Sequence, residues 1–115
     1  MPPNISQERR QSERVISRCP LRYQFKGQPN FYDTVTRDIS AGGLRFITNQ
    51  FIPAFAELFL ELSLRPAAEP LQVPAKVTWI QKVPHSDQYH VGACFSELNQ
   101  EHKKNLTERL WQYQQ

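Results

Sequence analysis

Three arginines near the N-terminus are spaced so that two of them can grip one anionic group. Arg10 and Arg14 are four residues apart, and Arg9 stands immediately before them. A separation of four places two side chains on one side of the chain, whether the segment is helical or extended. Guanidinium groups bind phosphates or the O6/N7 edge of guanine through paired hydrogen bonds, and they stack on purines. On charge alone, a solvated, solubilising arm is the simpler interpretation.

A second group of polar and small residues lies at positions 38–43, between two predicted strands. Asp38 and Ser40 can both bond nearby backbone N–H groups, and a following glycine tolerates φ > 0, as an ordinary turn requires. The same residues could also read a nucleotide. Asp38 would accept from the N1–H and N2–H₂ edge of guanine, Ser40 would bond a phosphate or brace the loop, and Gly43 would let the backbone approach.

The other residues that could act in catalysis do not form an active-site pattern. His85, His90 and His102 fall in a predicted loop, strand and helix, without the spacing of metal ligands. The sequence has no nucleophile elbow, phosphate-cradling glycine-rich loop or H-E-x-x-H motif. We expect His90 to face solvent and Cys94 to be a small buried hydrophobe. The sequence therefore predicts no enzyme, no catalytic residue, no metal and no cofactor.

Composition indicates one small domain whose positive charge lies at one end. A chain of 115 residues fits a single core. The formal net charge is +3, yet residues 1–26 carry six basic and two acidic side chains, against eight basic and nine acidic in the rest. No apolar stretch reaches the ~18 residues of a membrane helix, and the first residues lack the apolar segment of a secretory signal. We expect a cytoplasmic protein without membrane insertion.

Beyond residue 14 the apolar residues recur with a period of two, which is typical of half-buried strands. The sequence predicts six strands, at about residues 15–25, 31–37, 43–48, 58–64, 71–82 and 89–95. Pro74 in the fifth strand implies an edge or a bulge, and Gly92 in the sixth implies a bulge or a close backbone approach. Turns are predicted at residues 27–30, 65–70 and 84–87.

The last part of the chain follows a different pattern. Residues 99–115 contain neither glycine nor proline, and Leu106, Leu110 and Tyr113 recur at helical spacing. The predicted fold class is therefore all-β with one C-terminal helix. Six antiparallel strands close into a small barrel, which removes exposed edges. A flexible basic arm at residues 1–14 precedes this domain of residues 15–115, whose helix covers about residues 99–115.

Together, the two groups of polar residues resemble the PilZ domain family. Arg10 and Arg14 match its R-x-x-x-R motif, while Asp38, Ser40 and Gly43 match D-x-S-x-x-G. The family patterns G-L-x-F and G-x-x-F also recur, at residues 43–46 and 92–95. The resemblance extends from about residue 9 to residue 115. It implies a six-stranded split barrel that serves as a receptor for the bacterial second messenger cyclic di-GMP.

The resemblance also implies where the ligand would bind. The arm would wrap cyclic di-GMP against the barrel face that carries Asp38, and a lone domain of this kind would act through a downstream partner protein. The implied ligand-binding residues are Arg9, Arg10, Arg14, Asp38, Ser40, Gly42 and Gly43. In this family an arginine immediately before R-x-x-x-R, here Arg9, goes with a stacked pair of ligands. We therefore expect two cyclic di-GMP molecules per chain.

Two other interpretations of the sequence remain open. The chain could be a PilZ-like adaptor that binds no nucleotide, although a non-binder has no chemical need for the intact arginine and aspartate motifs. It could also be a small barrel that binds RNA or single-stranded DNA through the arm and exposed aromatic side chains. Nucleic acid is the weaker alternative, because the body of the domain is net negative and a groove that follows a strand needs basic residues.

Overall fold

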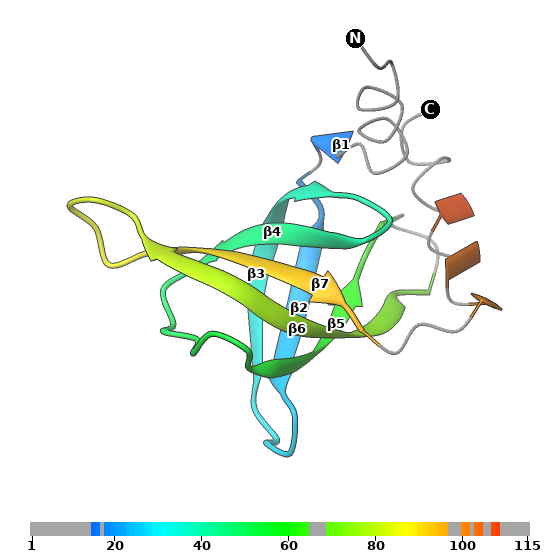
Figure 1. Ribbon diagram of the computed structural model, residues 1–115, viewed down its shortest axis with the longest axis horizontal. Helices are drawn as coiled ribbons and strands as arrows, with labels where there is room; N and C mark the ends of the chain where they lie inside the picture. Colours follow the sequence, from blue (N-terminus) through cyan, green and yellow to red (C-terminus); the bar gives the residue numbers. More distant parts are fainter. Residues whose placement is uncertain are drawn as a thin grey trace, which may run out of the picture.

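A computed structural model describes residues 15–16, 18–64, 69–96, 100–101, 103–104 and 107–108 of the chain. Seven strands cover most of these residues (Figure 1). They are β1 (Val15–Ile16), β2 (Pro20–Phe25), β3 (Phe31–Ile39), β4 (Gly43–Thr48), β5 (Glu57–Leu62), β6 (Leu71–Lys82) and β7 (Tyr89–Phe95).

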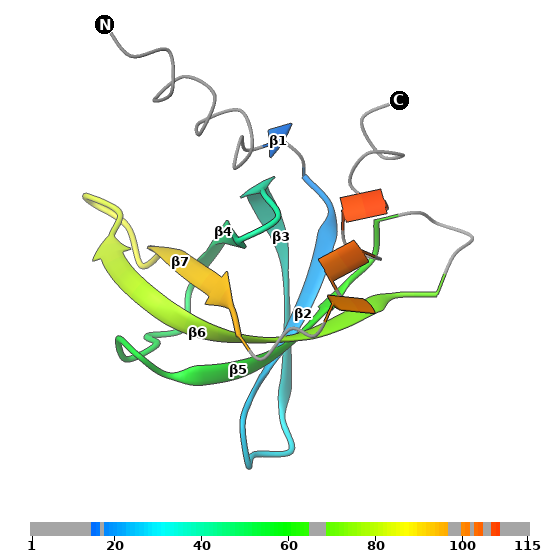
Figure 2. The ribbon, with the colours of Figure 1, turned by 45° about the vertical axis from the view of Figure 1, so that its right-hand side comes forward.

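Six of the strands form a closed antiparallel barrel, which confirms the predicted barrel. β3 pairs with β2, β2 with β5, and β5 with β6. β6 then pairs with β7, β7 with β4, and β4 returns to β3, so none of the six is left as an open edge. The short strand β1 lies at the far end of β3 and pairs with Ile39 and Asp38 (Figure 2).

The first predicted strand, residues 15–25, is wrong as a single element, because the structure divides it into β1 and β2. Both pair with β3, but three residues between Ile16 and Pro20 face only two between Asp38 and Val35. An extra residue cannot stay in a regular ladder, so the strand is interrupted there. At the interruption, the Cys19 N–H donates to the Thr36 hydroxyl oxygen at 3.1 Å.

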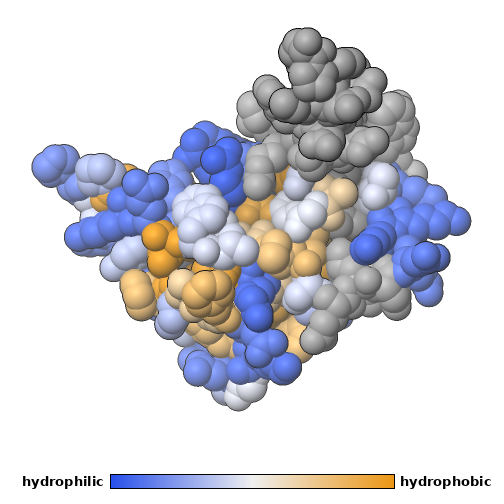
Figure 3. Space-filling model, in the orientation of Figure 1, coloured by the Kyte–Doolittle hydropathy of each residue, from blue (hydrophilic) through white to orange (hydrophobic). Residues whose placement is uncertain are grey.

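The core is formed by alternate side chains of the six barrel strands, as the period of two predicted. Its largest fully buried members include Tyr23, Phe46 and Ile39, together with the inward leucines of β5. The Tyr23 hydroxyl lies 2.7 Å from the buried hydroxyl of Thr48. Apolar surface gathers in the middle of the face in Figure 3, and the hairpin tips are hydrophilic. Among the described residues, the large apolar side chains left exposed are Phe31, Val35, Phe51, Phe55, Phe59 and Trp79.

The proline and glycine expected to disturb the strands both do so. Pro74 lies just beyond the pairing of β6 with β7, which begins at Ala75, and its carbonyl accepts the Ser96 N–H at 2.9 Å. Its nitrogen faces the same side and has no hydrogen to donate back to Ser96, so the ladder with β7 ends there while the ladder with β5 loses no bond. Opposite Gly92, the register of β6 shifts between Val77 and Trp79, so a bulge is present there, but its extra residue, Thr78, lies in β6 and not in the strand of Gly92 as predicted.

Two further expectations have different outcomes. Cys94 is exposed and not buried as predicted, because its neighbour Ala93 takes the inward position on β7 and turns Cys94 outward. The predicted C-terminal helix, about residues 99–115, lies largely outside the described residues and stays a prediction, as does the predicted arm at residues 1–14. Within the part of the chain that the structure describes, no helix is long and apolar enough to cross a membrane.

Candidate functional site

A bulge in β3 turns Asp38 to the outer face of the barrel. Thr36 pairs with Phe46 of β4, and Asp38 pairs with Arg45, so Arg37 is an extra residue in β3. Without the bulge, Thr36 and Asp38 would share a face, because they are two residues apart. With it, Thr36 is buried on the inside and Asp38 lies opposite the exposed Arg45 on the outside. The bulge therefore gives the outer surface its carboxylate.

Asp38 and Arg45 form an ion pair across β3 and β4. Both the Nε and Nη2 groups of Arg45 donate to Oδ2 of Asp38, the first at 2.7 Å. The Asp38 side chain is only 4% exposed, whereas that of Arg45 is 47% exposed. The hydrogen bond to Asp38 raises the pKa of the Arg45 guanidinium. A nearly buried carboxylate is thus held beside a cation that reaches solvent.

Ser40 fixes the tight turn that joins β3 to β4. Its N–H donates to the Gly43 carbonyl at 2.8 Å, and its hydroxyl oxygen accepts the Gly42 N–H at 3.2 Å. The hydroxyl also donates to the Gly43 carbonyl at 3.3 Å. Among the roles predicted for Ser40, the structure shows the bracing of this loop. The turn holds Asp38 and Arg45 in register at its base.

The two glycines of this turn have different surroundings, and neither has the positive φ that the sequence suggested. Among the described glycines, only Gly27 has a positive φ. A Cβ on Gly43 would lie 2.3 Å from the Ala93 carbonyl oxygen, so Gly43 permits β4 to approach the backbone of β7. A Cβ on Gly42 would meet only open space and the Ser40 hydroxyl at 4.0 Å.

A small cavity lies beside the ion pair. It has a volume of about 170 Å³ and is lined by Arg37, Asp38, Arg45 and His90. His90 was expected to face solvent, but it is only partly exposed and lies on β7 opposite Ile47. Two guanidinium groups, one carboxylate and one imidazole can together bind an anion that also carries hydrogen-bond donors.

An aromatic surface continues the site across two more strands. Trp79, Gly92, Arg45 and Asp38 follow one another in register on β6, β7, β4 and β3. A Cβ on Gly92 would lie 2.2 Å from Nε1 of Trp79, so the indole ring covers the glycine. The Trp79 side chain remains 38% exposed. Indole rings stack on nucleobases, and this row therefore combines a stacking surface with a charged pair.

The structure brings together part of the predicted set of ligand-binding residues. Asp38, Ser40, Gly42 and Gly43 share the β3–β4 hairpin, while Arg9, Arg10 and Arg14 lie outside the described residues. β1 begins at Val15, the next residue after Arg14 in the sequence, and pairs with Ile39 and Asp38. The position that follows the arginine motif is therefore paired with the strand that carries Asp38.

Sequence reasoning did not identify Arg37, Arg45, Trp79 and His90 as members of this site. Arg45 could have been found, because a four-residue turn at 40–43 between paired strands places position 45 opposite position 38. The other three depend on the bulge in β3 and on the pairing of β6 with β7, neither of which leaves a local signal. Among the described residues, no three His, Cys, Asp or Glu side chains are grouped so that they could hold a metal ion.

Comparisons with known proteins agree with this geometry. Residues 8–111 match the family model of the PilZ domain. The inhibitor of motility MotI/DgrA from Bacillus subtilis superposes with a TM-score of 0.72 at 21% identity, over 92% of this chain and 51% of that one. The present chain thus spans about half the length of that protein. No match was found among curated proteins.

Two further solved structures cover nearly whole chains. The PilZ domain of YcgR from Escherichia coli, determined with c-di-GMP, has a TM-score of 0.68 at 14% identity over 89% of this chain and 88% of that one. A tetrameric PilZ protein from Xanthomonas campestris has a TM-score of 0.72 at 12% identity, over 88% of this chain and 87% of that one. At these identities the likeness shows the fold alone. With the family match over most of its length, however, the chain belongs to the PilZ domain family.

Proposed function

We propose that this protein is a non-enzymatic receptor for cyclic di-GMP that relays binding to a partner protein. The ligand is held between the N-terminal arm, residues 1–14, and the barrel face that carries Asp38. The observation that carries the proposal is the row Trp79–Gly92–Arg45–Asp38, because it combines a stacking plane, a cation and a carboxylate across four strands. A related PilZ domain, that of YcgR, was determined with c-di-GMP.

Each part of the ligand has a chemical counterpart in this arrangement. The guanine N1–H and N2–H₂ groups are donors that a carboxylate such as Asp38 accepts. The two phosphates and the O6/N7 edges are acceptors that the guanidinium groups of Arg10 and Arg14 bind in pairs. Arg45 supplies a further guanidinium beside Asp38, and the Trp79 ring offers a plane for a base.

The nucleotide-independent adaptor is the second candidate, and one observation favours it. The ion pair with Arg45 and the braced turn give Asp38 and Ser40 structural roles that need no ligand. The same two residues therefore do not by themselves require a nucleotide. Binding measurements separate the two candidates directly.

Calorimetry with cyclic di-GMP tests the proposal, with GMP and a short RNA as control ligands. We expect cyclic di-GMP to bind, and Arg10→Ala and Arg14→Ala each to weaken it about tenfold to a hundredfold, as the loss of a paired charge-assisted contact of ~1–3 kcal/mol predicts. Arg22→Ala is the matched control, because Arg22 lies on β2, outside the row that carries the site, and is bonded to Asp33. Absence of binding, or unchanged affinity in both arm variants, would contradict the proposal.

A further inference from the structure

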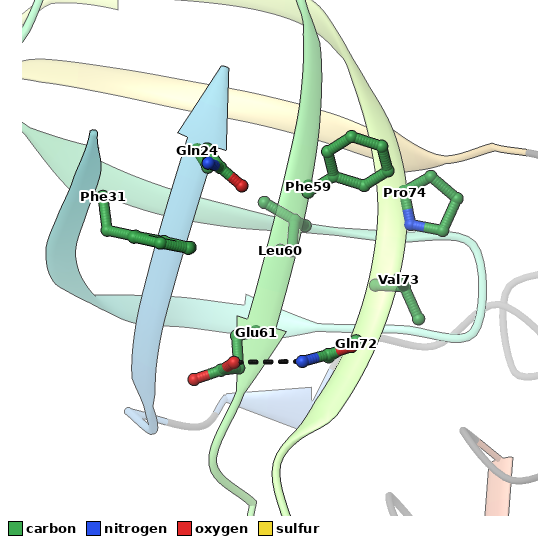
Figure 4. A pocket seen from close by; sticks show the side chains of 8 residues that line it. All are labelled: Gln24, Phe31, Phe59, Leu60, Glu61, Gln72, Val73 and Pro74. Atoms are coloured by element: carbon green, nitrogen blue, oxygen red, sulfur yellow. Dashed lines mark hydrogen bonds between the residues drawn. The ribbon is translucent and has the colours of Figure 1, made fainter. Parts of the chain in front are cut away.

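A second surface crosses β2 and β5, two strands that take no part in the row Trp79–Gly92–Arg45–Asp38. Phe31, Gln24, Phe59 and Pro74 form one row in register over β3, β2, β5 and β6. A groove of about 400 Å³ follows this row, and Glu61 and Gln72 are among its lining residues. Figure 4 shows the ring of Phe31 on one side and the rings of Phe59 and Pro74 on the other. We call it the β5 groove.

Phe59 and Phe31 are exposed although the fold does not require an apolar residue at either position. On β5 the inward residues are leucines, and the outward ones are Glu57, Phe59 and Glu61. Phe59 therefore breaks the alternation of polar and apolar residues, and its side chain is 47% exposed, while that of Phe31 is 53% exposed. Clustered exposed aromatic side chains of this kind mark interaction surfaces.

The charges around the groove leave one carboxylate without a cation. Arg22 is the register partner of Glu61, but its Nε donates to Asp33 at 3.2 Å and its guanidinium lies 5.4 Å from the Phe31 ring centroid. Glu61 instead accepts a hydrogen bond from the neutral amide of Gln72 at 3.2 Å. Among the described residues, Glu61 has no basic partner. An occupant of this groove therefore gains by bringing a cation.

The shape of the groove favours a peptide segment over a small molecule. Phe31 and Phe59, at the two sides of the groove, are both half-exposed, so an occupant would be covered mainly from one side. Small-molecule pockets, in contrast, enclose most of their ligand. The groove has apolar side chains at its centre and the carboxylate of Glu61 at one end. A short peptide segment can therefore contact both with two neighbouring side chains. Aromatic and arginine side chains are also the groups that dominate protein interfaces.

We propose that the β5 groove docks a short segment of a partner protein in which a large apolar side chain stands beside an arginine or lysine. The apolar side chain packs between Phe31 and Phe59, and the basic group bonds Glu61. The groove residues Gln24, Phe31, Phe59, Glu61 and Pro74 differ from those that line the cavity beside Asp38, so the groove can be tested without nucleotide.

A phage-displayed library of short random peptides, selected on the full chain without nucleotide, tests this assignment. We expect the selected peptides to share a large apolar residue next to arginine or lysine. A synthetic peptide of that sequence should bind about tenfold more weakly to Phe59→Thr and to Glu61→Gln. Phe51→Thr is the matched control, because Phe51 is also exposed, at 62%, but lies outside the groove, and affinity should not change.

Three outcomes would overturn the assignment: no enriched peptide, peptides without a basic residue, or equal binding to the parent and to both groove variants. A concentration-dependent dimer that Phe59→Thr abolishes would also overturn it, because a second copy of the chain would then occupy the groove. Thermal melting confirms that each variant is folded. Glu61→Gln removes only a charge from an outward side chain, so it keeps the test decisive if Phe59→Thr does not fold.

Discussion

At the scale of single residues, Asp38 has two possible roles, and one substitution separates them. If it reads the guanine edge, Asp38→Ala should weaken cyclic di-GMP binding and abolish the preference over cyclic di-AMP. The same variant should be less stable by about 1–3 kcal/mol, because Arg45 loses a charge-assisted hydrogen bond. Calorimetry with both dinucleotides and urea unfolding measure the two effects.

Arg45→Ala is the matched control for this substitution. It breaks the same ion pair but keeps the carboxylate, so it should lower stability and retain the preference for guanine. Because the Asp38 carboxylate is nearly buried, losing this cation should lower stability more than breaking a fully exposed ion pair would. Intact guanine selectivity in Asp38→Ala would restrict Asp38 to a structural role.

Tyr23 provides a test of the core that depends on pH. Burial raises the pKa of Tyr23 above its ordinary value of 10.0, so the folded state keeps its proton where the unfolded state has lost it. The stabilising contribution is complete below pH 10 and is lost as the pH rises from 10 through the folded-state pKa. Tyr23→Phe should abolish this alkaline loss and, at pH 7, cost about 1 kcal/mol by removing the bond to Thr48. Urea unfolding as a function of pH checks both effects, and equal alkaline slopes in parent and variant would contradict the assignment.

At the scale of elements, one glycine in the β3–β4 turn, Gly42, and two on the neighbouring strands β4 and β7, Gly43 and Gly92, should respond differently to alanine. In Gly43→Ala the new Cβ meets the backbone of β7, which cannot move aside alone, so we expect the largest loss, of about 1–3 kcal/mol. In Gly92→Ala it meets the Trp79 ring, which can swing outward, so the loss should be smaller. Gly42→Ala meets open space and should be neutral. Urea unfolding of the three variants checks the order, and similar losses at Gly42 and Gly43 would show that strand packing is not the cause.

The elements also show which features could be predicted from the sequence. Strands β4, β6 and β7 begin and end where predicted, because alternation between core and solvent is a local signal. The break between β1 and β2 could not be predicted, since it comes from a mismatch with β3, which is distant in the sequence.

The same physical limit applies to the candidate site. Asp38 was identified from its motif, but its place on the outer face depends on the bulge at Arg37. The position of the Trp79 ring over Gly92 depends on the pairing of β6 with β7. Ser40 was expected to bond a phosphate or brace the loop, and only the second role can be seen without a ligand. Local sequence thus predicts which residues lie in strands, while long-range register decides which of them meet.

At the scale of the whole molecule, the arm and the barrel face should form one binding unit. Residues 1–14 are polar and lack an apolar period, so we predict that they are mobile without ligand and become ordered on binding. Trypsin cleavage at Arg9, Arg10 and Arg14 should therefore slow when cyclic di-GMP is added. Cleavage at Arg22, on β2, serves as the internal control. Equal rates with and without the dinucleotide would remove arm ordering from the signalling step.

The number of ligands bound depends on the charge that the whole molecule can offer. Two stacked cyclic di-GMP molecules carry four phosphate charges, so a third arm arginine is useful both as a cation and as a plane on an exposed guanine. We therefore predict two ligands per chain, and expect Arg9→Leu to shift the ratio towards one while binding stays measurable. Calorimetric titration with both components at known concentration gives the ratio, and Arg18→Leu controls for the loss of one positive charge from the same basic segment. A ratio near one for the unmutated protein would show that Arg9 does not recruit a second ligand.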